Sequence, residues 1–346
     1  ATMPENNGYD FNFGGRQNGS PGNYHASGQL FGTAIGPGLD AFAKNYDSTY
    51  VTDILTPIAN GNDLSLVTGD NKHVEDALGD AAIAFMNEVR NGQLSDRPFY
   101  LQLHNYAVHT PISNTQARDD LLDKYAGITS SDPRHNSNPY AAIAEGIDQT
   151  VGRILDYLDD PNGDGSTTDS IASETLVIFT SDNGGHIGPT DNDPLRFRKG
   201  SFYNGGLRVP LIARQPGTIP AGQQTDTLVH AVDFYPTLVA HAGLTMPGGI
   251  VFDGTSFATH MQDPVANPRD RGPIFYHFPG YLDQRARPCE VVIKRVDGDD
   301  YKLIYTYDLG YTGNPGNSED SSEGLDPLPD NWELFRYSID LGETDD

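Results

Sequence analysis

An acidic residue, an amide residue and two glycines follow an apolar run of this sequence. Residues 175–180 (TLVIFT) predict a buried strand of the kind found in parallel sheets, and Asp182, Asn183, Gly184 and Gly185 come just beyond it. Carboxylate and amide oxygens suit a hard cation such as Ca²⁺, and glycines let the backbone turn tightly beside the ligands. Taken alone, this segment is more often an ordinary turn, so a metal site needs support from other segments.

A histidine follows a second apolar run. Residues 99–103 predict a buried strand, and His109 lies beyond it in the segment HNYAVHTP. Functional groups gather at the carboxyl ends of strands in parallel α/β sheets. A histidine there can donate a proton or hydrogen-bond an anionic oxygen, although a lone histidine is more often structural.

A short run of cations stands out because the chain is strongly acidic. The formal net charge of the 346 residues is −26, yet Arg196, Arg198 and Lys199 lie within four residues of one another. The overall charge repels anionic substrates, nucleic acids and anionic membranes, so we expect neither of the last two as a partner. A site for an anionic ester needs a local cation, and this run can supply it.

The elements that must position these residues follow from apolar periodicity. Helical spacing alternates with short apolar strands, which predicts an α/β core with a largely parallel central sheet. Residues 1–60 have few apolar repeats and predict surface loops that pack on another part of the protein. The predicted helices are residues 72–89, 139–158 and 232–242, and the predicted strands are residues 99–103, 175–180 and 209–213.

The pattern changes after about residue 263. Short apolar runs separated by turn residues predict a small C-terminal sheet of antiparallel strands. We therefore expect two domains, residues 1–265 and 266–346. The predicted strands are residues 274–278, 290–295, 301–307 and 333–338, with a turn at 296–300 and a surface loop at 311–331.

Composition excludes some further classes. Hydrophobic residues make up 36% of the chain, which is enough for a sizeable core, and no run of 18 apolar residues predicts a membrane span. Cys289 is the only cysteine, so no disulfide can form within the chain. We interpret it as a small buried apolar residue without a catalytic role, because no basic partner or helix start lies near it in the sequence.

Taken together and in order, these segments resemble the sulfatase family. The resemblance covers about residues 95–346 and implies an alkaline-phosphatase-like α/β fold that hydrolyses sulfate esters. Shorter matches are DFYPTL at 233–238, DGTS at 253–256, YKLI at 301–304 and WELF at 332–335. The main matching segments are FYLQLHNYAVHTP, AEGIDQTVGRILD, TLVIFTSDNGG and RKGSFYNGGLRVPLI.

The resemblance also implies roles for individual residues. Asp182 and Asn183 match two of the family's Ca²⁺ ligands, His109 matches the histidine that contacts the sulfate group, and Lys199 matches the lysine that binds sulfate oxygens. His186 and His277 are further candidates for the substrate pocket. We expect a sulfated sugar or an aryl sulfate as substrate, and a periplasmic or extracellular location.

The sequence departs from the family at the nucleophile. The family uses a formylglycine made from the Cys or Ser of a C/S-x-P/A-x-R motif, and this motif is absent from the 346 residues. An N-terminal aspartate pair that completes the family's metal site is absent as well. We therefore expect that this chain cannot run the reaction unaided, and that a separate N-terminal fragment or a homo-oligomer could be its partner.

Two alternatives remain open at this point. One is a phosphodiesterase or phosphonate hydrolase of the same superfamily, and the other is a non-catalytic, truncated chain. A second cation site also has to be weighed, because residues 160–166 (DPNGDGS) resemble the first half of an EF-hand loop. Its twelfth position is Ile171, whose side chain cannot coordinate, so a solvated turn is the better interpretation.

Overall fold

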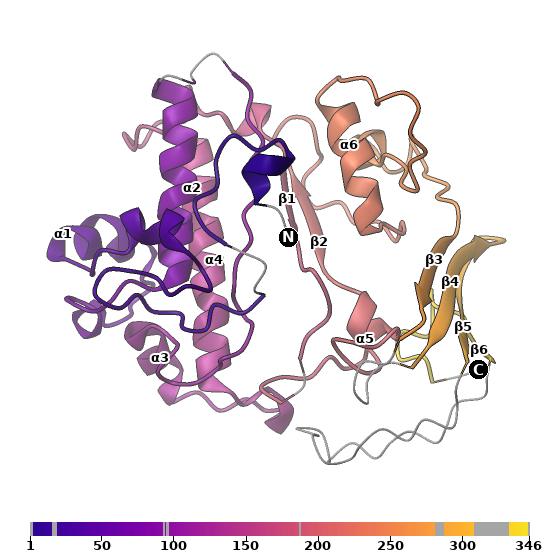
Figure 1. The fold of residues 1–346 in the computed structure, drawn as a ribbon, viewed down its shortest axis with the longest axis horizontal. Helices are drawn as coiled ribbons and strands as arrows, with labels where there is room; N and C mark the ends of the chain where they lie inside the picture. Colours follow the sequence, from indigo (N-terminus) through magenta and orange to yellow (C-terminus); the bar gives the residue numbers. More distant parts are fainter. Residues whose placement is uncertain are drawn as a thin grey trace. The chain divides into compact units, whose positions relative to one another are not determined.

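The computed structural model describes residues 3–15, 19–92, 94, 97–186, 188–280, 287–307 and 332–344 (Figure 1). The chain packs as two units, Ala1–Ala172 and Ser173–Asp346, and each is described here by itself. The domain boundary predicted at residue 265 stays a prediction, and the predicted loop at 311–331 lies outside the described residues. Among the described residues, no helix is long and apolar enough to cross a membrane.

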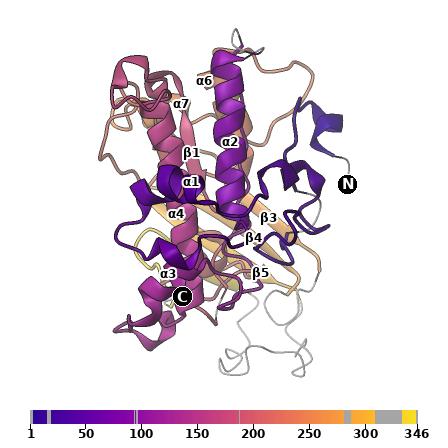
Figure 2. The same ribbon diagram turned by 90° about the vertical axis from the view of Figure 1, so that its left-hand side faces the viewer.

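Two long helices form the frame of the first unit. They are α2 (Val74–Asn91) and α4 (Asn138–Asp159), which run beside each other in both views (Figures 1 and 2). His73 caps α2 by accepting the backbone N–H of Glu75, and the Ser137 hydroxyl accepts an N–H in the first turn of α4. Both predicted helices are confirmed.

The two helices approach closely and share a core with the N-terminal region. A Cβ at Gly79 of α2 would lie 3.1 Å from Thr150 Cγ2 of α4, which is a tight contact. Residues 1–60 pack on the rest of this unit, as expected, and several of their apolar side chains are buried in it. The fully buried ones include Tyr24, Ile35, Leu39 and Leu55. Two shorter helices are α1 (Ser48–Tyr50) and α3 (Asp119–Ala126).

The predicted buried strand at residues 99–103 is wrong. The segment forms no strand within the described chain, and its exposure alternates, so that Tyr100 is 55% exposed. Phe99 on the other side packs its ring against Phe85 of α2. Leu103 packs against the core of the first unit. Within the described residues, no neighbouring strand supplies the backbone hydrogen bonds that a ladder requires.

The second unit opens on a pair of short strands. They are β1 (Val177–Thr180) and β2 (Leu211–Arg214), and their register pairs Val177 with Arg214. The pairing is antiparallel, so the parallel order expected for the central strands is not found in these two. The one α-helix in the described part of their connection, Asn204–Leu207, has four residues, whereas a parallel pair needs a longer crossover connection, usually a helix. The strand predicted at residues 175–180 is found as β1, but none of its residues is fully buried, so the predicted burial is wrong.

Short helices follow in the second unit. Asp233 precedes α6, and its carboxylate accepts the backbone N–H of His230 in a capping box. The helix predicted at 232–242 is confirmed, with a 3₁₀ turn at Ala231–Asp233 before it. The helices of this unit are α5 (Asn204–Leu207), α6 (Phe234–His241) and α7 (Ala258–Gln262).

The C-terminal sheet is confirmed as an antiparallel sheet in the order β3-β4-β5-β6. Asp297 and Gly298 form the tight turn between β4 and β5, with φ of 50° and 92°, the conformation that favours Gly at a hairpin turn. Cys289 is buried at one edge of the core, and burial raises the pKa of its thiol to about 12. The strands are β3 (Ile274–Phe278), β4 (Cys289–Val296), β5 (Asp299–Thr306) and β6 (Trp332–Phe335).

Candidate active site

The loop after β1 carries the predicted metal ligands. Asp182 is exposed and Asn183 is half-buried. The Ser181 hydroxyl donates to the Asn183 carbonyl oxygen at 2.9 Å, which fixes the first turn of the loop. Within the described chain, neither the Asp182 carboxylate nor the Asn183 side-chain amide has a hydrogen-bond or ion-pair partner. Both oxygens are therefore open to a ligand.

A second loop lies against the first. The Gly184 N–H donates to the Gly206 carbonyl oxygen at 2.9 Å, and the Lys199 N–H donates to the Gly185 carbonyl oxygen at 3.0 Å. The Asn192 side-chain amide also donates to Gly185 O at 3.1 Å. The structure thus brings the Lys199 backbone into direct contact with the segment that holds Asp182 and Asn183.

Glycine makes this contact possible. A Cβ on Gly184 would lie 1.7 Å from the carbonyl oxygen of Gly205, and one on Gly205 would lie 1.9 Å from the carbonyl oxygen of Phe197. Any other residue would force the two loops apart, because these neighbours are backbone atoms that cannot rotate away. The glycines predicted to turn beside the ligands also allow the two loops to touch.

Arg196 has a structural role rather than a free charge. Its Nη1 lies 3.0 Å from the Glu343 carbonyl oxygen and 3.5 Å from Glu333 Oε1. The guanidinium also lies over the Tyr203 ring, 4.3 Å from its centroid. The predicted cation run is therefore divided, because Arg196 holds the loop in place while the Lys199 ammonium has no ion-pair partner within the described chain.

A buried ion pair supports the same loop. Lys302 Nζ donates to Glu343 Oε1 at 2.6 Å and to Asn204 Oδ1 at 2.9 Å, and Glu343 Oε2 accepts the Asn204 N–H at 2.5 Å. Lys302 and Glu343 are both fully buried. Burial lowers the pKa of Lys302 and raises that of Glu343, while each partner opposes the shift in the other. The start of α5 is thereby tied to β5 and to the last described residues.

His109 belongs to the first unit, whereas the residues described so far belong to the second. It is half-buried, and its Nδ1 is 3.0 Å from the Thr110 carbonyl oxygen. When Nδ1 donates there, Nε2 is the nitrogen left for a ligand. The structure describes the two units separately, so the predicted proximity of His109 to Lys199 stays a prediction.

The two weaker histidine candidates differ in their surroundings. His186 is half-buried at the end of the loop that carries Asp182. His277 lies on β3, where its exposed imidazole is 3.3 Å from the Glu290 carboxylate. Its neighbours Tyr276 and Phe278 pack against Phe202, so His277 points to the opposite face of the sheet.

The described residues supply only part of a Ca²⁺ site. No group of three or more His, Cys, Asp or Glu side chains that could hold a metal is found among them. Ca²⁺ takes six to eight oxygen ligands, and Asp182 and Asn183 fit that chemistry as two of them. At residues 160–166, by contrast, both Asp160 carboxylate oxygens accept backbone N–H groups of their own turn, as expected for a solvated turn.

Several supporting residues could not be predicted from the sequence. Lys302 lies within a predicted strand, but its buried partner Glu343 is distant in the sequence, and no local pattern connects them. Tyr24 and Glu75, which contact the His109 segment, were likewise missed. Glu75 has one recognisable signal, because an acidic residue in the first turn of a helix is common on electrostatic grounds.

Comparison with known proteins identifies the class. The family model described as Sulfatase matches residues 1–244. A second model, N-sulphoglucosamine sulphohydrolase, C-terminal, matches residues 195–312. The chain belongs to the sulfatase family, whose members hydrolyse sulfuric esters.

Individual relatives agree with this assignment. The chain is 44% identical to a sulfatase of Formosa agariphila over 310 residues, which is 88% of this chain and 51% of that protein. It is 31% identical to the N-acetylgalactosamine-6-sulfatase of Sus scrofa over 219 residues, covering 62% of this chain and 37% of that protein. The chain thus spans about half the length, or less, of these curated relatives.

Solved structures confirm the fold. The crystal structure of Ps i-CgsB in complex with k-i-k-neocarrahexaose superposes with a TM-score of 0.60 at 24% identity, covering 88% of this chain and 59% of that one. The structure of BT4656 in complex with its substrate D-glucosamine-2-N,6-O-disulfate gives a TM-score of 0.55 at 19% identity, covering 80% and 65%. The α/β class with a small C-terminal antiparallel sheet is therefore confirmed.

Proposed function

We propose that this chain carries the metal- and sulfate-binding part of a Ca²⁺-dependent sulfate-ester hydrolase that acts on a sulfated sugar or an aryl sulfate. One observation carries the proposal, namely the contact between the Asp182–Asn183 loop and the Lys199 loop through Gly184 and Gly185. The sugar substrates named for relatives of known activity or structure support the choice of a sulfated sugar.

Each residue has a role in this proposal that follows from its chemistry. Asp182 and Asn183 hold Ca²⁺, which, when bound, supplies positive charge against the sulfate oxygens. Lys199 gives the local cation that an anionic ester needs in a chain of net charge −26, and it stabilises charge that develops on the sulfate group. His109 donates a hydrogen bond to the ester.

The nucleophile is the missing part. Because the formylglycine motif is absent from these 346 residues, we infer that a further polypeptide segment, such as a separate N-terminal fragment, supplies it. The family resemblance and the acidic composition also support a periplasmic or extracellular location.

Binding without turnover is the expected result for the purified 346-residue chain. Calorimetry with 4-nitrophenyl sulfate in excess Ca²⁺ should show saturable binding, and Lys199→Ala should weaken it about 10- to 100-fold, as the loss of a charge-assisted hydrogen bond predicts. Lys294→Ala is the control, because Lys294 is an exposed lysine on β4 and should leave the affinity unchanged.

Two outcomes would contradict this function. If Lys199→Ala binds the ester as tightly as the wild type, Lys199 is not the sulfate-binding lysine. If the 346-residue chain releases 4-nitrophenol at a robust rate, the inference that a further segment supplies the nucleophile is wrong.

A further inference from the structure

The segment that carries His109 is held between two buried side chains. The Tyr24 hydroxyl lies 2.8 Å from the carbonyl oxygen of Tyr106 and 2.7 Å from that of His109. On the other side, Glu75 Oε1 accepts the backbone N–H groups of Tyr106 at 3.1 Å and Ala107 at 2.9 Å. Tyr24 and Glu75 are both 0% exposed, so water does not compete for these contacts.

The same segment is closed on itself between these contacts. The His109 N–H donates to the Tyr106 carbonyl oxygen at 2.9 Å, which makes residues 106–109 a single turn. Glu75 therefore holds the entry to the turn, and Tyr24 spans both ends of it. The turn as a whole has few degrees of freedom left, and His109 is its last residue.

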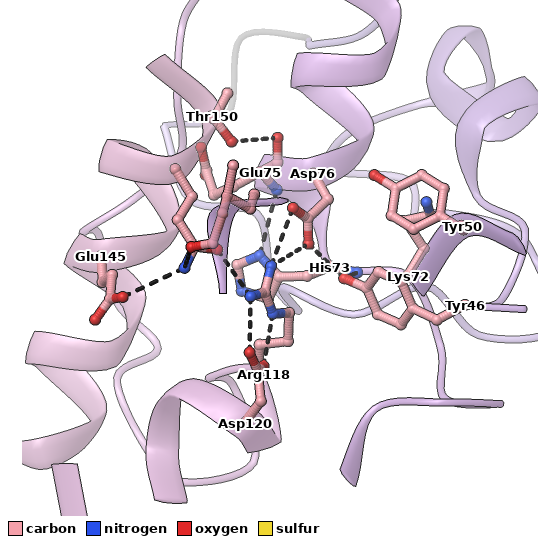
Figure 3. A network of polar contacts seen from close by, with 12 residues as sticks. Tyr46, Tyr50, Lys72, His73, Glu75, Asp76, Arg118, Asp120, Glu145 and Thr150 are labelled. Carbon is pink, nitrogen blue, oxygen red and sulfur yellow. Dashed lines mark hydrogen bonds and ion pairs between the residues drawn. The ribbon is translucent and has the colours of Figure 1, made fainter. Parts of the chain in front are cut away.

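Glu75 itself is firmly placed. Its N–H donates to His73 Nδ1, and its carbonyl oxygen accepts the Thr150 hydroxyl of α4 at 3.1 Å (Figure 3). The Tyr24 ring stacks on His73, with centroids 5.3 Å apart. The two side chains that hold the turn therefore share a support, because both contact His73 at the start of α2.

Burying a carboxyl group costs free energy unless hydrogen bonds or an opposite charge compensate for the lost water. Glu75 Oε2 has no hydrogen-bond partner, and the nearby guanidinium groups serve other carboxylates. Arg118 pairs with Asp76 at 3.2 Å and Asp120 at 2.7 Å (Figure 3). Arg153 Nη1 lies 3.9 Å from Asp76. Within the described chain, the Glu75 carboxyl thus binds backbone N–H groups and no cation. Its hydrogen bonds therefore act on the backbone of the segment that carries His109.

We propose that Glu75 and Tyr24 are positioning residues that clasp the Tyr106–His109 turn and thereby fix the imidazole of His109 for the ester. The effect on the ester rests on the proposed function, whereas the clasp itself does not. Neither residue touches the substrate, and each acts through the backbone that carries His109. The prediction is that removing the clasp has the same consequence for ester binding as removing His109.

Hydrogen–deuterium exchange on the full 346-residue chain tests the clasp. Glu75→Ala should speed exchange in the peptide covering residues 104–111 at least about tenfold, because two hydrogen bonds of ordinary strength are lost. Glu75→Gln should restore most of the protection, since the amide oxygen can accept the same two N–H groups. The α4 peptide, residues 138–159, is the internal control and should exchange at the wild-type rate in both variants.

Tyr24→Phe gives a second, milder test, which also serves if Glu75→Ala does not fold. It removes only the hydroxyl and should speed exchange in the same peptide severalfold. The clasp is overturned if Glu75→Ala or Tyr24→Phe leaves residues 104–111 at the wild-type rate, or if Glu75→Gln exchanges as fast as Glu75→Ala.

The affinity for the ester then shows whether Glu75 positions His109 or only stabilises the fold. If Glu75 acts through His109, the double variant Glu75→Ala/His109→Ala should bind 4-nitrophenyl sulfate no more weakly than His109→Ala alone. Additive losses would overturn the link between clasp and ester site. If His109→Ala has no effect on affinity while the exchange results hold, the clasp stands and the role of His109 in the proposed function fails.

Discussion

Lys302→Met is expected to lower the free energy of unfolding of the second unit by about 3–5 kcal/mol, the range for removing one partner of a buried ion pair. Lys302 and Glu343 are both fully buried and 2.6 Å apart. Without Lys302, the Asn204 N–H is the one hydrogen-bond donor that the Glu343 carboxylate keeps among the described residues. The Asn204 side-chain oxygen loses its partner at the same time.

Urea unfolding followed by tryptophan fluorescence measures this loss. The sequence has one tryptophan, Trp332, which pairs with Tyr305 on the strand that carries Lys302. The double variant Lys302→Met/Glu343→Gln should recover part of the stability, because no buried charge is left. Lys294→Met, at an exposed lysine of the neighbouring strand, should stay within about 0.5 kcal/mol of the wild type. A Lys302→Met protein as stable as this control would show that the pair is not formed.

The pair also bears on the candidate site. Glu343 contacts the start of α5 through Asn204 and contacts Arg196 through its carbonyl oxygen. These contacts lie on either side of Lys199 in the sequence. We therefore expect Lys302→Met to loosen the Lys199 loop as well as the C-terminal sheet.

Glu75→Gln is expected to change how stability depends on pH. Burial raises the pKa of Glu75 from 4.5 to about 7, although the N–H groups of Ala107 and Tyr106 oppose the shift. The folded chain therefore binds a proton more tightly than the unfolded chain, so the contribution of Glu75 is full below about pH 4.5 and is lost as the pH rises through about 7. The loss amounts to about 3 kcal/mol.

Comparing the wild type with Glu75→Gln isolates the contribution of Glu75 to the pH dependence of stability. His73 works in the opposite direction, since burial lowers its pKa to about 3, and stability is lost as its unfolded form gains a proton below about pH 6.5. That contribution is present in both proteins and cancels in their difference. The free energy of unfolding of the wild type, minus that of Glu75→Gln, should fall by about 3 kcal/mol between pH 4.5 and pH 8. A difference that is flat over this range would contradict a buried, proton-binding Glu75.

The sequence predicted the parts of the fold that depend on local patterns. The hairpin strands near Cys289 and Lys302 were placed within one or two residues, because period-two alternation and the Asp297–Gly298 turn are local signals. Helices α2 and α4 followed from their apolar spacing in the same way. The run at residues 99–103 failed because an apolar composition does not state whether a strand or a helix will cover it.

In the candidate site, too, the residues in local motifs could be predicted, and the residues that support them from distant segments could not. The order of Asp182, Asn183 and Lys199 in the chain was visible as motifs, and their juxtaposition depends on glycines that the sequence also shows. The residues that hold this site and the His109 turn could not be predicted. Glu343 is distant in the sequence from the loop it braces, and Glu75 looks like an ordinary acidic residue at a helix start until its backbone partners are known.

Calcium titration tests the central claim most directly. Calorimetry of the 346-residue chain should show one saturable Ca²⁺ site, and Asp182→Ala should abolish it, because Asp182 is the only carboxylate proposed to bind the ion. Asp164→Ala, in the turn that resembles half of an EF-hand loop, should bind Ca²⁺ like the wild type. Binding that survives in Asp182→Ala and is lost in Asp164→Ala would contradict the account and place the cation in the turn at residues 160–166.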